Sequence, residues 1–391
     1  MKQVFIAAAR RTPVGSFMGS LAGLSASQLG AVAIRDIYER LPLDPARINS
    51  VYLGNVLSAG LGQAPARQAA MFAGLLPATE ATTINKVCSS GIKATTLGAQ
   101  QIMMDLEELV ITGGMESMSN TPHYVNLRKG QKFGNAALTD GMIKDGLWDV
   151  YHDFHMGNAA ELGVRKFGLS RSELDDYALR SYGLARAAAD EGKFRDEIVP
   201  VTVSRGKQSS LLSRDEDIDK VIPEKLPKLA PAFEPEGSLT AANSSNLNDG
   251  AAMLLLGSGE AVKKFGLKPL ARIIGFADAA QEPEWFTTAP ALAIPKALRN
   301  AGVRQSEVDY FEINEAYASV VLSNVQLLGL DLNKVNVYGG AVAIGHPIGA
   351  SGARIIVTLL SVLRQEGGKY GVAAICNGGG GATALVVENL M

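Results

Sequence analysis

The sequence predicts an α/β protein made of two similar βαβαβ halves, with an insertion in the first half. Short apolar segments rich in β-branched residues alternate with longer stretches of helical periodicity near both ends of the chain. The 42 glycines suit a protein with many tight turns between strands and helices. With 391 residues, the chain is also too long for one hydrophobic core, so we expect two or three domains.

The first half starts with residues 1 to 117. Its apolar segments predict strands at Val4–Ala8, Val51–Leu53, Ala81–Ile84 and Glu108–Thr112. The stretches between them predict helices at Ser27–Tyr38, Ala64–Phe72 and Ser90–Met104. Because helices separate successive strands, we expect βαβ units and a largely parallel sheet.

The insertion covers residues 118–248 and begins with a polar, glycine-rich segment. Two helices are predicted in it, at Met156–Phe167 and Arg171–Glu191. Ser170 and Glu173 form a capping box at the start of the second helix. The apolar run Ala251–Leu256 then predicts a strand that returns to the first sheet, so residues 249–269 complete the first half.

The second half covers residues 270–391 and repeats the order of the first. Strands are predicted at Ile273–Phe276, Tyr310–Ile313, Lys334–Val337, Val372–Ile375 and Thr383–Val387, and helices at Pro290–Asn300, Ala316–Leu328 and Ser351–Arg364. Ser90-Gly91-Ile92-Lys93 and Ser351-Gly352-Ala353-Arg354 each open a helix that leads to a strand and a pair of glycines. Such matches recur in the same order along both halves, which indicates an internal duplication.

Charge and cysteine content exclude several classes of protein. The net charge of −2 provides no basic field for nucleic acid and no polybasic membrane patch. Two cysteines outside any CxxC pair indicate a reducing compartment. Arg10 and Arg11 interrupt the first apolar run, so it is no signal peptide, and no run is long enough to span a membrane. We therefore expect a cytoplasmic protein.

Cys88 lies between the predicted strand Ala81–Ile84 and the predicted helix that begins at Ser90. A thiol there faces the unpaired backbone N–H groups of the first helical turn, which favour an anion. We therefore expect a lowered pKa and a nucleophilic thiolate. The alternative is a cysteine that only fills space in the core.

Three further turns carry chemistry-bearing residues. His346 stands alone in a glycine-rich loop, where it is either functional or a structural histidine bonded to the backbone. Cys376 precedes four consecutive glycines, including Gly378, whose N–H groups could form an oxyanion hole. Asn314 lies where a strand meets a helix, a position that also suits a helix N-cap. Turns at the carboxyl ends of strands form sites in α/β proteins, so we expect all four to meet between the halves.

Together these segments resemble the signatures of the thiolase family. The matching stretches are Val87-Cys88-Ser89-Ser90-Gly91, Asn314-Glu315-Ala316-Tyr317, Gly345-His346-Pro347-Ile348-Gly349 and Cys376-Asn377-Gly378-Gly379-Gly380. They occur in the family's order and spacing, and the resemblance covers essentially the whole chain. It implies a layered α/β/α/β/α core and a ping-pong Claisen condensation of two acetyl-CoA molecules to acetoacetyl-CoA and coenzyme A (CoA).

The resemblance also implies a role for each residue. Cys88 would take the acetyl group, with His346 helping to activate it. Cys376 would act as general acid and base. Asn314, through a held water, would stabilise the enolate together with His346. The N–H groups of Cys88 and Gly378 would hold the tetrahedral oxyanion.

The insertion resembles the family's loop domain, which covers the pantetheine arm of CoA. His155, Met156 and Ser245 match its pantetheine-lining positions, and Lys220 is the nearest candidate for the nucleotide end. The pair Trp285-Phe286 would line a short acyl pocket, and Ala350 also favours a short-chain enzyme. His123 and His152 are expected at the surface. No cluster has zinc spacing, so we expect no metal, and no cofactor besides the CoA substrates.

Other functions are compatible with parts of the pattern. A broader-chain 3-ketoacyl-CoA thiolase of fatty-acid β-oxidation is the main alternative. A decarboxylating ketoacyl synthase would have a histidine or an asparagine at the position of Cys376, and a non-catalytic relative would have lost one of the four segments. The resemblance further implies a homodimer or a homotetramer, with the tetramer formed through the insertion.

Overall fold

The computed structural model describes residues 1–41, 43–205 and 208–391. Its main sheet has the strand order β14-β15-β16-β13-β1-β12-β5-β3-β4, and the short strand β2 also pairs with β12. The first half supplies β1 (Val4–Arg11), β2 (Gly15–Ser16), β3 (Ser50–Gly54), β4 (Glu80–Ile84), β5 (Leu109–Ser117) and β12 (Asn248–Ser258). The second half supplies β13 (Ala271–Ala280), β14 (Tyr310–Ile313), β15 (Tyr370–Asn377) and β16 (Gly381–Asn389). Among the described strands, the two parts of the sheet pair only through Val4–Ile6 of β1 and residues 271–273 of β13.

The two parts of the sheet have the same internal order. The sequence β1-β12-β5-β3 in the first half corresponds to β13-β16-β15-β14 in the second, which agrees with the predicted duplication. The prediction of a largely parallel sheet is wrong. Only β3–β4, β3–β5 and β14–β15 are parallel among the pairs along this path. A short glycine turn joins β15 to β16, and the strands that follow the insertion also run back antiparallel.

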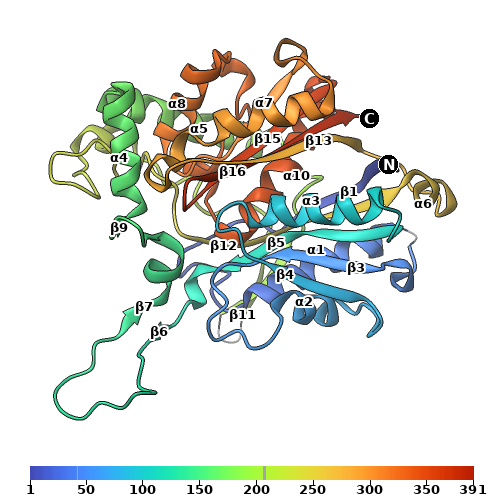
Figure 1. Cartoon of the computed structure of the whole chain (residues 1–391), viewed down its shortest axis with the longest axis horizontal. Helices are drawn as coiled ribbons and strands as arrows, with labels where there is room; N and C mark the ends of the chain where they lie inside the picture. Colours follow the sequence, from blue (N-terminus) through green and yellow to red (C-terminus); the bar gives the residue numbers. More distant parts are fainter. Residues whose placement is uncertain (42, 206–207) are drawn as a thin grey trace.

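Helices cover both outer faces of the sheet and fill the space between its two parts (Figure 1). On the outside of the first half lie α1 (Ala26–Arg40) and α2 (Pro65–Ala73), and on the outside of the second lie α7 (Pro290–Ala301) and α8 (Ala318–Leu328). Helices α3 (Ser90–Met103) and α10 (Ile348–Glu366) contact strands of both halves. All residues from 348 to 363 of α10 are buried, as expected for a helix in a central layer. The core is therefore a layered α/β/α/β/α structure.

The insertion forms its own helices and hairpins beside this core. Its elements are β6 (His123–Tyr124), β7 (Thr139–Asp140), β8 (Trp148–Asp149), β9 (Phe154–His155), α4 (Met156–Phe167), α5 (Arg171–Asp190), β10 (Val201–Arg205) and β11 (Gln208–Leu212), and α6 (Gly259–Lys264) follows β12. The predicted capping box of Ser170 and Glu173 is confirmed at the start of α5. The segment between β6 and β7 extends far from the rest of the molecule (Figure 1).

One predicted strand is wrong. Residues Leu332–Lys334 form a 3-10 turn, and only Val335 makes an isolated bridge with Phe311 of β14. Asn336 has a φ of 49°, which is outside the extended region. Its side chain hydrogen-bonds the N–H and the carbonyl of Ile313, at 2.9 and 2.8 Å, so it takes the place of a neighbouring strand. In the described ranges, no helix is long and apolar enough to cross a membrane.

Candidate active site

A small cavity of about 40 Å³ lies where the four turns meet. Residues that line it are Val87, Cys88, Gly146, Leu147, Met156, Ser245, Phe286, Ala316, Tyr317, His346, Ile348 and Gly378. The segment before α3, the segment after β14, the loop before α10 and the turn after β15 all contribute to this lining. The four turns therefore converge from both halves, as expected, although neither Asn314 nor Cys376 is among the residues that line the cavity.

Cys88 is held in a strained turn between β4 and α3. Its neighbour Val87 has a φ of 47°, which is rare for a β-branched residue and marks a position that the surrounding structure enforces. The Ser90 hydroxyl donates to the carbonyl of Val87 at 2.6 Å and accepts from the N–H of Lys86 at 2.8 Å. These bonds fix the turn, and Cys88 stays partly exposed to the cavity while Cys376 is buried.

The expected lowering of the Cys88 pKa is wrong. Burial raises the pKa of the Cys88 thiol to about 12, and the charge of Glu116 adds to this rise. Backbone N–H groups of Gly378 and of Cys88 itself point at the sulfur and act in the opposite direction, but burial outweighs them. The helix N-terminus is therefore present, yet the resting nucleophile is a neutral thiol.

The neighbours of the two thiols are tied together across the halves. Ser89 is fully buried, and its hydroxyl lies 2.9 Å from Oδ1 of Asn377 and 3.1 Å from the carbonyl oxygen of Ile375. Asn377 in turn donates from Nδ2 to the carbonyl of Gly378 at 2.9 Å. Ile375 and Asn377 flank Cys376, so the residue beside the first thiol is bonded to both neighbours of the second.

His346 is oriented as a base towards the cavity. The backbone N–H of His346 donates to Oδ1 of Asn248 at 2.9 Å. In its imidazole ring, Nδ1 lies 2.6 Å from the hydroxyl of Ser351. That hydroxyl donates its proton to the carbonyl of Pro347, so Nδ1 carries the imidazole proton and Nε2 has a free lone pair. Nε2 is buried and has no partner in the described part of the chain. Burial, with the positive charge of Arg354, lowers the pKa of His346 to about 3, so the ring is neutral.

Cys376 is the last residue but one of β15 and has no exposed surface. Burial raises the pKa of its thiol, and the charge of a Cys88 thiolate would raise it further. Because the two thiols influence each other in this way, only one of them is charged at a time.

Asn314 is fully buried, and neither Oδ1 nor Nδ2 has a partner within the described ranges. It does not cap a helix, because α8 begins only at Ala318. The next residue, Glu315, accepts from the hydroxyls of Tyr177 and Ser181, both at 2.7 Å, and these residues belong to α5 of the insertion. Glu315 thus anchors the turn, and the Asn314 amide remains available for a ligand.

The predicted CoA-binding residues fall into two groups. Met156, Ser245 and Phe286 line the cavity around Cys88. Nδ1 of His155 accepts from the N–H of Gly157 at 3.0 Å, which makes His155 the N-cap of α4. Of the predicted aromatic pair, only Phe286 lines the cavity. Trp285 does not, and its ring makes a cation–π contact with the amine of Lys166.

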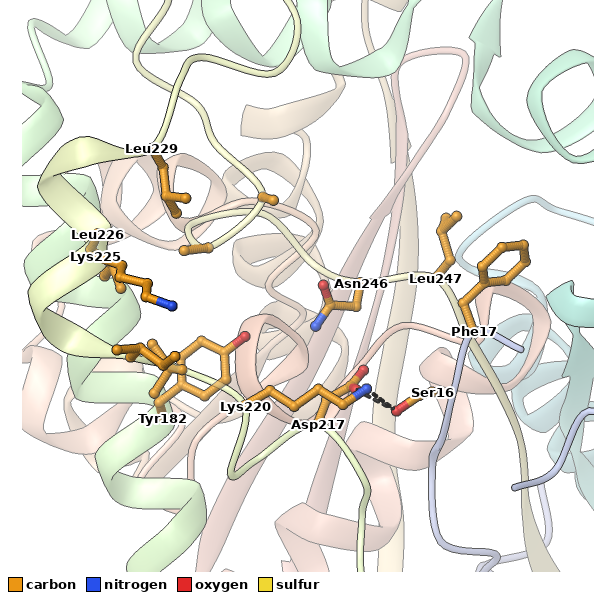
Figure 2. Close-up of a pocket in the computed structure, with 14 residues that line it drawn as sticks. Ser16, Phe17, Tyr182, Asp217, Lys220, Lys225, Leu226, Leu229, Asn246 and Leu247 are labelled. Carbon is orange, nitrogen blue, oxygen red and sulfur yellow. Dashed lines mark hydrogen bonds and ion pairs between the residues drawn. The ribbon is translucent and has the colours of Figure 1, made fainter. Parts of the chain in front are cut away.

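Lys220 lines a separate pocket of about 450 Å³ between the insertion and the N-terminal half (Figure 2). Its amine pairs with Asp217 at 2.7 Å and donates to the hydroxyl of Ser16 at 2.5 Å. Lys225 and Tyr182 line the same pocket. Ser245 lines the catalytic cavity while Asn246 and Leu247 line this pocket, so the chain around residue 245 joins the two.

Other predictions can be placed as well. His123 and His152 are exposed at the surface, as predicted. Ala350, in the first turn of α10, lies against Gly114 of β5 and does not line the cavity. Among the described residues, no group of three or more His, Cys, Asp or Glu side chains has a geometry that could hold a metal ion.

Sequence reasoning missed several residues of the site. Leu147 and Ile348 close the cavity, and Tyr317 adds a hydroxyl to it. Glu116 is fully buried and accepts from Asn55 and from the N–H of Gly349, at 2.7 and 2.9 Å. Glu116 could have been recognised from the sequence, because it follows an apolar strand segment. A carboxylate buried in such a strand needs several hydrogen-bond donors around it, which indicates a structural or functional role. The others are apolar or small residues that no local pattern distinguishes.

Comparison with known proteins agrees with this site. Residues 4–260 match the family model described as thiolase, N-terminal domain, and residues 267–389 match thiolase, C-terminal domain. The chain is 54% identical to acetyl-CoA acetyltransferase 2 of Arabidopsis thaliana, over 100% of this chain and 98% of that protein. It is 52% identical to the cytosolic acetyl-CoA acetyltransferase ERG10 of Gibberella zeae, over 99% of this chain and 98% of that protein.

A solved structure is similar over its whole length. The Acat5 thiolase from Ascaris suum, crystallised in complex with coenzyme A, superposes with a TM-score of 0.95 at 45% identity and covers 100% of both chains. The matched models span nearly the whole sequence, and the fold and the four convergent turns are those that the resemblance predicts. The chain therefore belongs to the thiolase family.

Proposed function

We propose that this protein is an acetyl-CoA C-acetyltransferase that interconverts two acetyl-CoA molecules with acetoacetyl-CoA and CoA. The observation that carries the proposal is the convergence of a partly exposed Cys88, a neutral His346 and the N–H of Gly378 on one cavity, with Cys376 behind it. The identities of 54% and 52% with acetyl-CoA acetyltransferases support the same activity.

In the first step, Cys88 attacks the thioester carbonyl of acetyl-CoA. Nε2 of His346 accepts the thiol proton during the attack, because a thiol with a pKa near 12 is not ionised beforehand. The N–H groups of Cys88 and Gly378 stabilise the negative oxygen of the tetrahedral intermediate. When the carbon–sulfur bond to CoA breaks, the Cys376 thiol donates its proton to the leaving CoA thiolate. The products are acetyl-Cys88, CoA, a Cys376 thiolate and a protonated His346.

In the second step, the Cys376 thiolate removes a proton from the methyl group of a second acetyl-CoA. The Asn314 amide and the protonated form of His346 stabilise the enolate oxygen. The enolate carbon attacks the acetyl group of acetyl-Cys88, the bond from that carbonyl carbon to the Cys88 sulfur breaks, and the Cys88 thiolate takes its proton back from His346. Acetoacetyl-CoA is then released, and the reverse sequence cleaves it with CoA.

The cavity size supports a short acyl group. At about 40 Å³, the cavity beside Cys88 is far smaller than the pocket of about 450 Å³ that Lys220 lines. Phe286, Leu147 and Met156 form apolar walls beside Cys88, so chains longer than acetyl have little room. This favours the acetoacetyl-CoA enzyme over a broader-chain 3-ketoacyl-CoA thiolase of fatty-acid β-oxidation.

The remaining predictions complete the proposal. Ser245, Met156 and His155 lie along the pantetheine arm, and the pocket of Lys220 takes the nucleotide end of CoA. The domains are residues 1–117 with 249–269, the insertion 118–248, and residues 270–391. The enzyme works in the cytoplasm, which the cytosolic relative supports, without a cofactor or metal. Recovery of the native protein in mitochondria after cell fractionation would contradict that location.

The enzyme is a homodimer or a homotetramer. Strand β4 pairs only with β3 in the described structure, so its other edge has unpaired backbone groups that a second copy could use. Phe133, in the segment between β6 and β7, is 96% exposed, and Leu127 and Leu138 near it are also exposed. Apolar side chains of this kind on a projecting segment suit a second contact between dimers.

The test is a comparison of the wild type with Cys88→Ala. The wild type should cleave acetoacetyl-CoA when CoA is added, and Cys88→Ala should retain less than about 0.1% of this activity, since no other thiol is exposed to the cavity. Full activity of the variant would exclude Cys88 as the nucleophile. A requirement for a malonyl thioester in condensation would instead assign the protein to the decarboxylating synthases.

A further inference from the structure

One buried hydroxyl group in the cavity has no task in the two steps above. Tyr317 lines the cavity together with Cys88 and His346, and only 7% of the residue is exposed. Within the described ranges its hydroxyl makes no hydrogen bond. A buried tyrosine hydroxyl usually has a partner, so this one is available to whatever enters the cavity.

The ring of Tyr317 cannot easily turn away. It packs edge-on against Phe233, with ring centres 5.8 Å apart, and against Phe286, with ring centres 6.4 Å apart. Its backbone also forms an isolated bridge with Ser244. These contacts on both sides of the cavity keep the hydroxyl in one place.

The hydroxyl stays protonated, and Tyr317 lines the same small cavity as Cys88. Burial raises the pKa of Tyr317, and the charges of Cys88 and Cys376 raise it further. The group is therefore a neutral donor and acceptor beside the acyl group that Cys88 carries. Most other side chains around this end of the cavity are apolar, including Leu147, Met156 and Phe286.

We propose that the Tyr317 hydroxyl is a specificity-determining group that limits the acyl chain on Cys88 to two carbons. An acetyl group leaves the hydroxyl in contact with solvent in the cavity, whereas one more methylene would press against it and strip it of any partner. The hydroxyl also occupies volume that a longer chain needs. This inference rests on the proposed acetyltransferase activity and names the group that sets its chain length.

The first test compares wild type and Tyr317→Phe with acetoacetyl-CoA and 3-ketopentanoyl-CoA. The second substrate places a propionyl group on Cys88 and an otherwise identical product in the CoA pocket. We expect the ratio of kcat/KM for 3-ketopentanoyl-CoA to that for acetoacetyl-CoA to rise about tenfold in the variant, because one methylene in an apolar pocket typically changes kcat/KM by 10–200-fold.

The second test follows the first half-reaction alone. Wild type and variant are mixed with acetyl-CoA or propionyl-CoA, and the mass of the Cys88 peptide is recorded over time. Wild type should acquire the acetyl group about ten times faster than the propionyl group, and Tyr317→Phe should acquire both at similar rates. This measurement does not depend on the condensation step or on Cys376.

Tyr38→Phe is the matched control, since its hydroxyl lies 2.5 Å from the carbonyl of Ala73 in the outer helices, far from the cavity. It should leave both ratios unchanged. Ratios that stay within twofold in Tyr317→Phe, or an equal loss with both substrates, would overturn the inference. If neither thioester labels Cys88 of the wild type, the proposed function itself fails, and this outcome is distinct from the other two.

Discussion

At the scale of single residues, the main feature is a neutral thiol beside a neutral imidazole. Burial raises the pKa of Cys88 to about 12 and lowers that of His346 to about 3, so neither group is charged near pH 7. A preformed thiolate–imidazolium pair is therefore not the resting state. The proton moves only when a thioester is in place, which protects the nucleophile from adventitious electrophiles.

This predicts how the reactivity of Cys88 depends on pH. The thiolate fraction of a group with a pKa near 12 grows about tenfold with each pH unit below that value. The rate of alkylation of Cys88 by iodoacetamide should therefore rise about tenfold per unit between pH 7 and pH 9, without a plateau. Peptide mass spectrometry measures this rate, with Cys88→Ala as the control. A plateau beginning near pH 7 would show that the thiol is ionised in the resting enzyme.

A second prediction concerns the bonds that connect the two thiol turns. Removal of Asn377 takes away the acceptor for the Ser89 hydroxyl and the donor to the Gly378 carbonyl. The N–H of Gly378 would then be less well placed for the oxyanion. Asn377→Ala should lower kcat by about 10- to 100-fold with little change in the KM for CoA, since the loss of one oxyanion donor costs about 10²–10³ in rate.

A double-mutant cycle separates this role from general damage. Ser89→Ala and Asn377→Ala should lower kcat by less in combination than the product of their separate effects, because they act through one bond. Asn300→Ala is the control, since it also removes a side-chain bond to a backbone carbonyl, that of Phe276, but outside the site. Equal effects of Asn300→Ala and Asn377→Ala on kcat would contradict the positioning role.

At the scale of secondary structure elements, the site depends on the close crossing of β5 and α10. A Cβ atom on Gly114 would lie 2.0 Å from the carbonyl oxygen of Gly349. Gly349 belongs to the turn that follows His346, and its N–H donates to Glu116 of β5. The absence of a side chain at residue 114 thus lets the helix that follows His346 approach the strand.

Gly114→Ala should therefore destabilise the protein and impair the site together. Backbone atoms cannot move aside as a flexible side chain can, so the free energy of unfolding should fall by about 2 kcal/mol or more. Gly183 lies inside α5 with no neighbouring atom within 4 Å of its added Cβ. Gly183→Ala, the control, should raise the free energy of unfolding by about 0.5–1 kcal/mol. Denaturant titration measures both, and a neutral Gly114→Ala would contradict this account.

At the scale of the whole molecule, the core brings two halves together while the insertion lies over the site. Exposed apolar side chains gather on the projecting segment between β6 and β7, where Phe133 is 96% exposed. The edge of β4 is the other open surface. If the edge of β4 forms a dimer and the projecting segment joins two dimers, the result is a tetramer.

Shortening the projecting segment tests this arrangement. Replacement of residues 125–138 by a short glycine-containing turn should reduce a tetramer to a dimer in analytical ultracentrifugation, because the apolar contact is lost. Acetoacetyl-CoA cleavage should remain within about threefold, as none of these residues lines the cavity. Phe133→Ser alone should weaken the tetramer in the same direction. A tetramer that survives the replacement would place the second contact elsewhere.

Much of the fold follows from local patterns. Helices α3, α4 and α5 begin and end within one residue of their predicted bounds, because amphipathic periodicity and capping are properties of neighbouring residues. Strand direction was predicted wrongly, since β12 finds β1 and β5 as partners only after the insertion has returned the chain. The strand predicted at Lys334–Val337 failed because the side chain of Asn336 satisfies the backbone groups of Ile313.

The sequence by itself determined which turns meet at the site, because the motifs around Cys88, Asn314, His346 and Cys376 are typical of one family. Only the tertiary structure decided their chemical state and surroundings. Burial by distant segments overrides the helix N-terminus and raises the pKa of Cys88. The same packing leaves the Tyr317 hydroxyl without a hydrogen-bond partner among the residues that the structure describes. Desolvation and hydrogen bonding depend on residues far apart in the chain, and no local pattern records them.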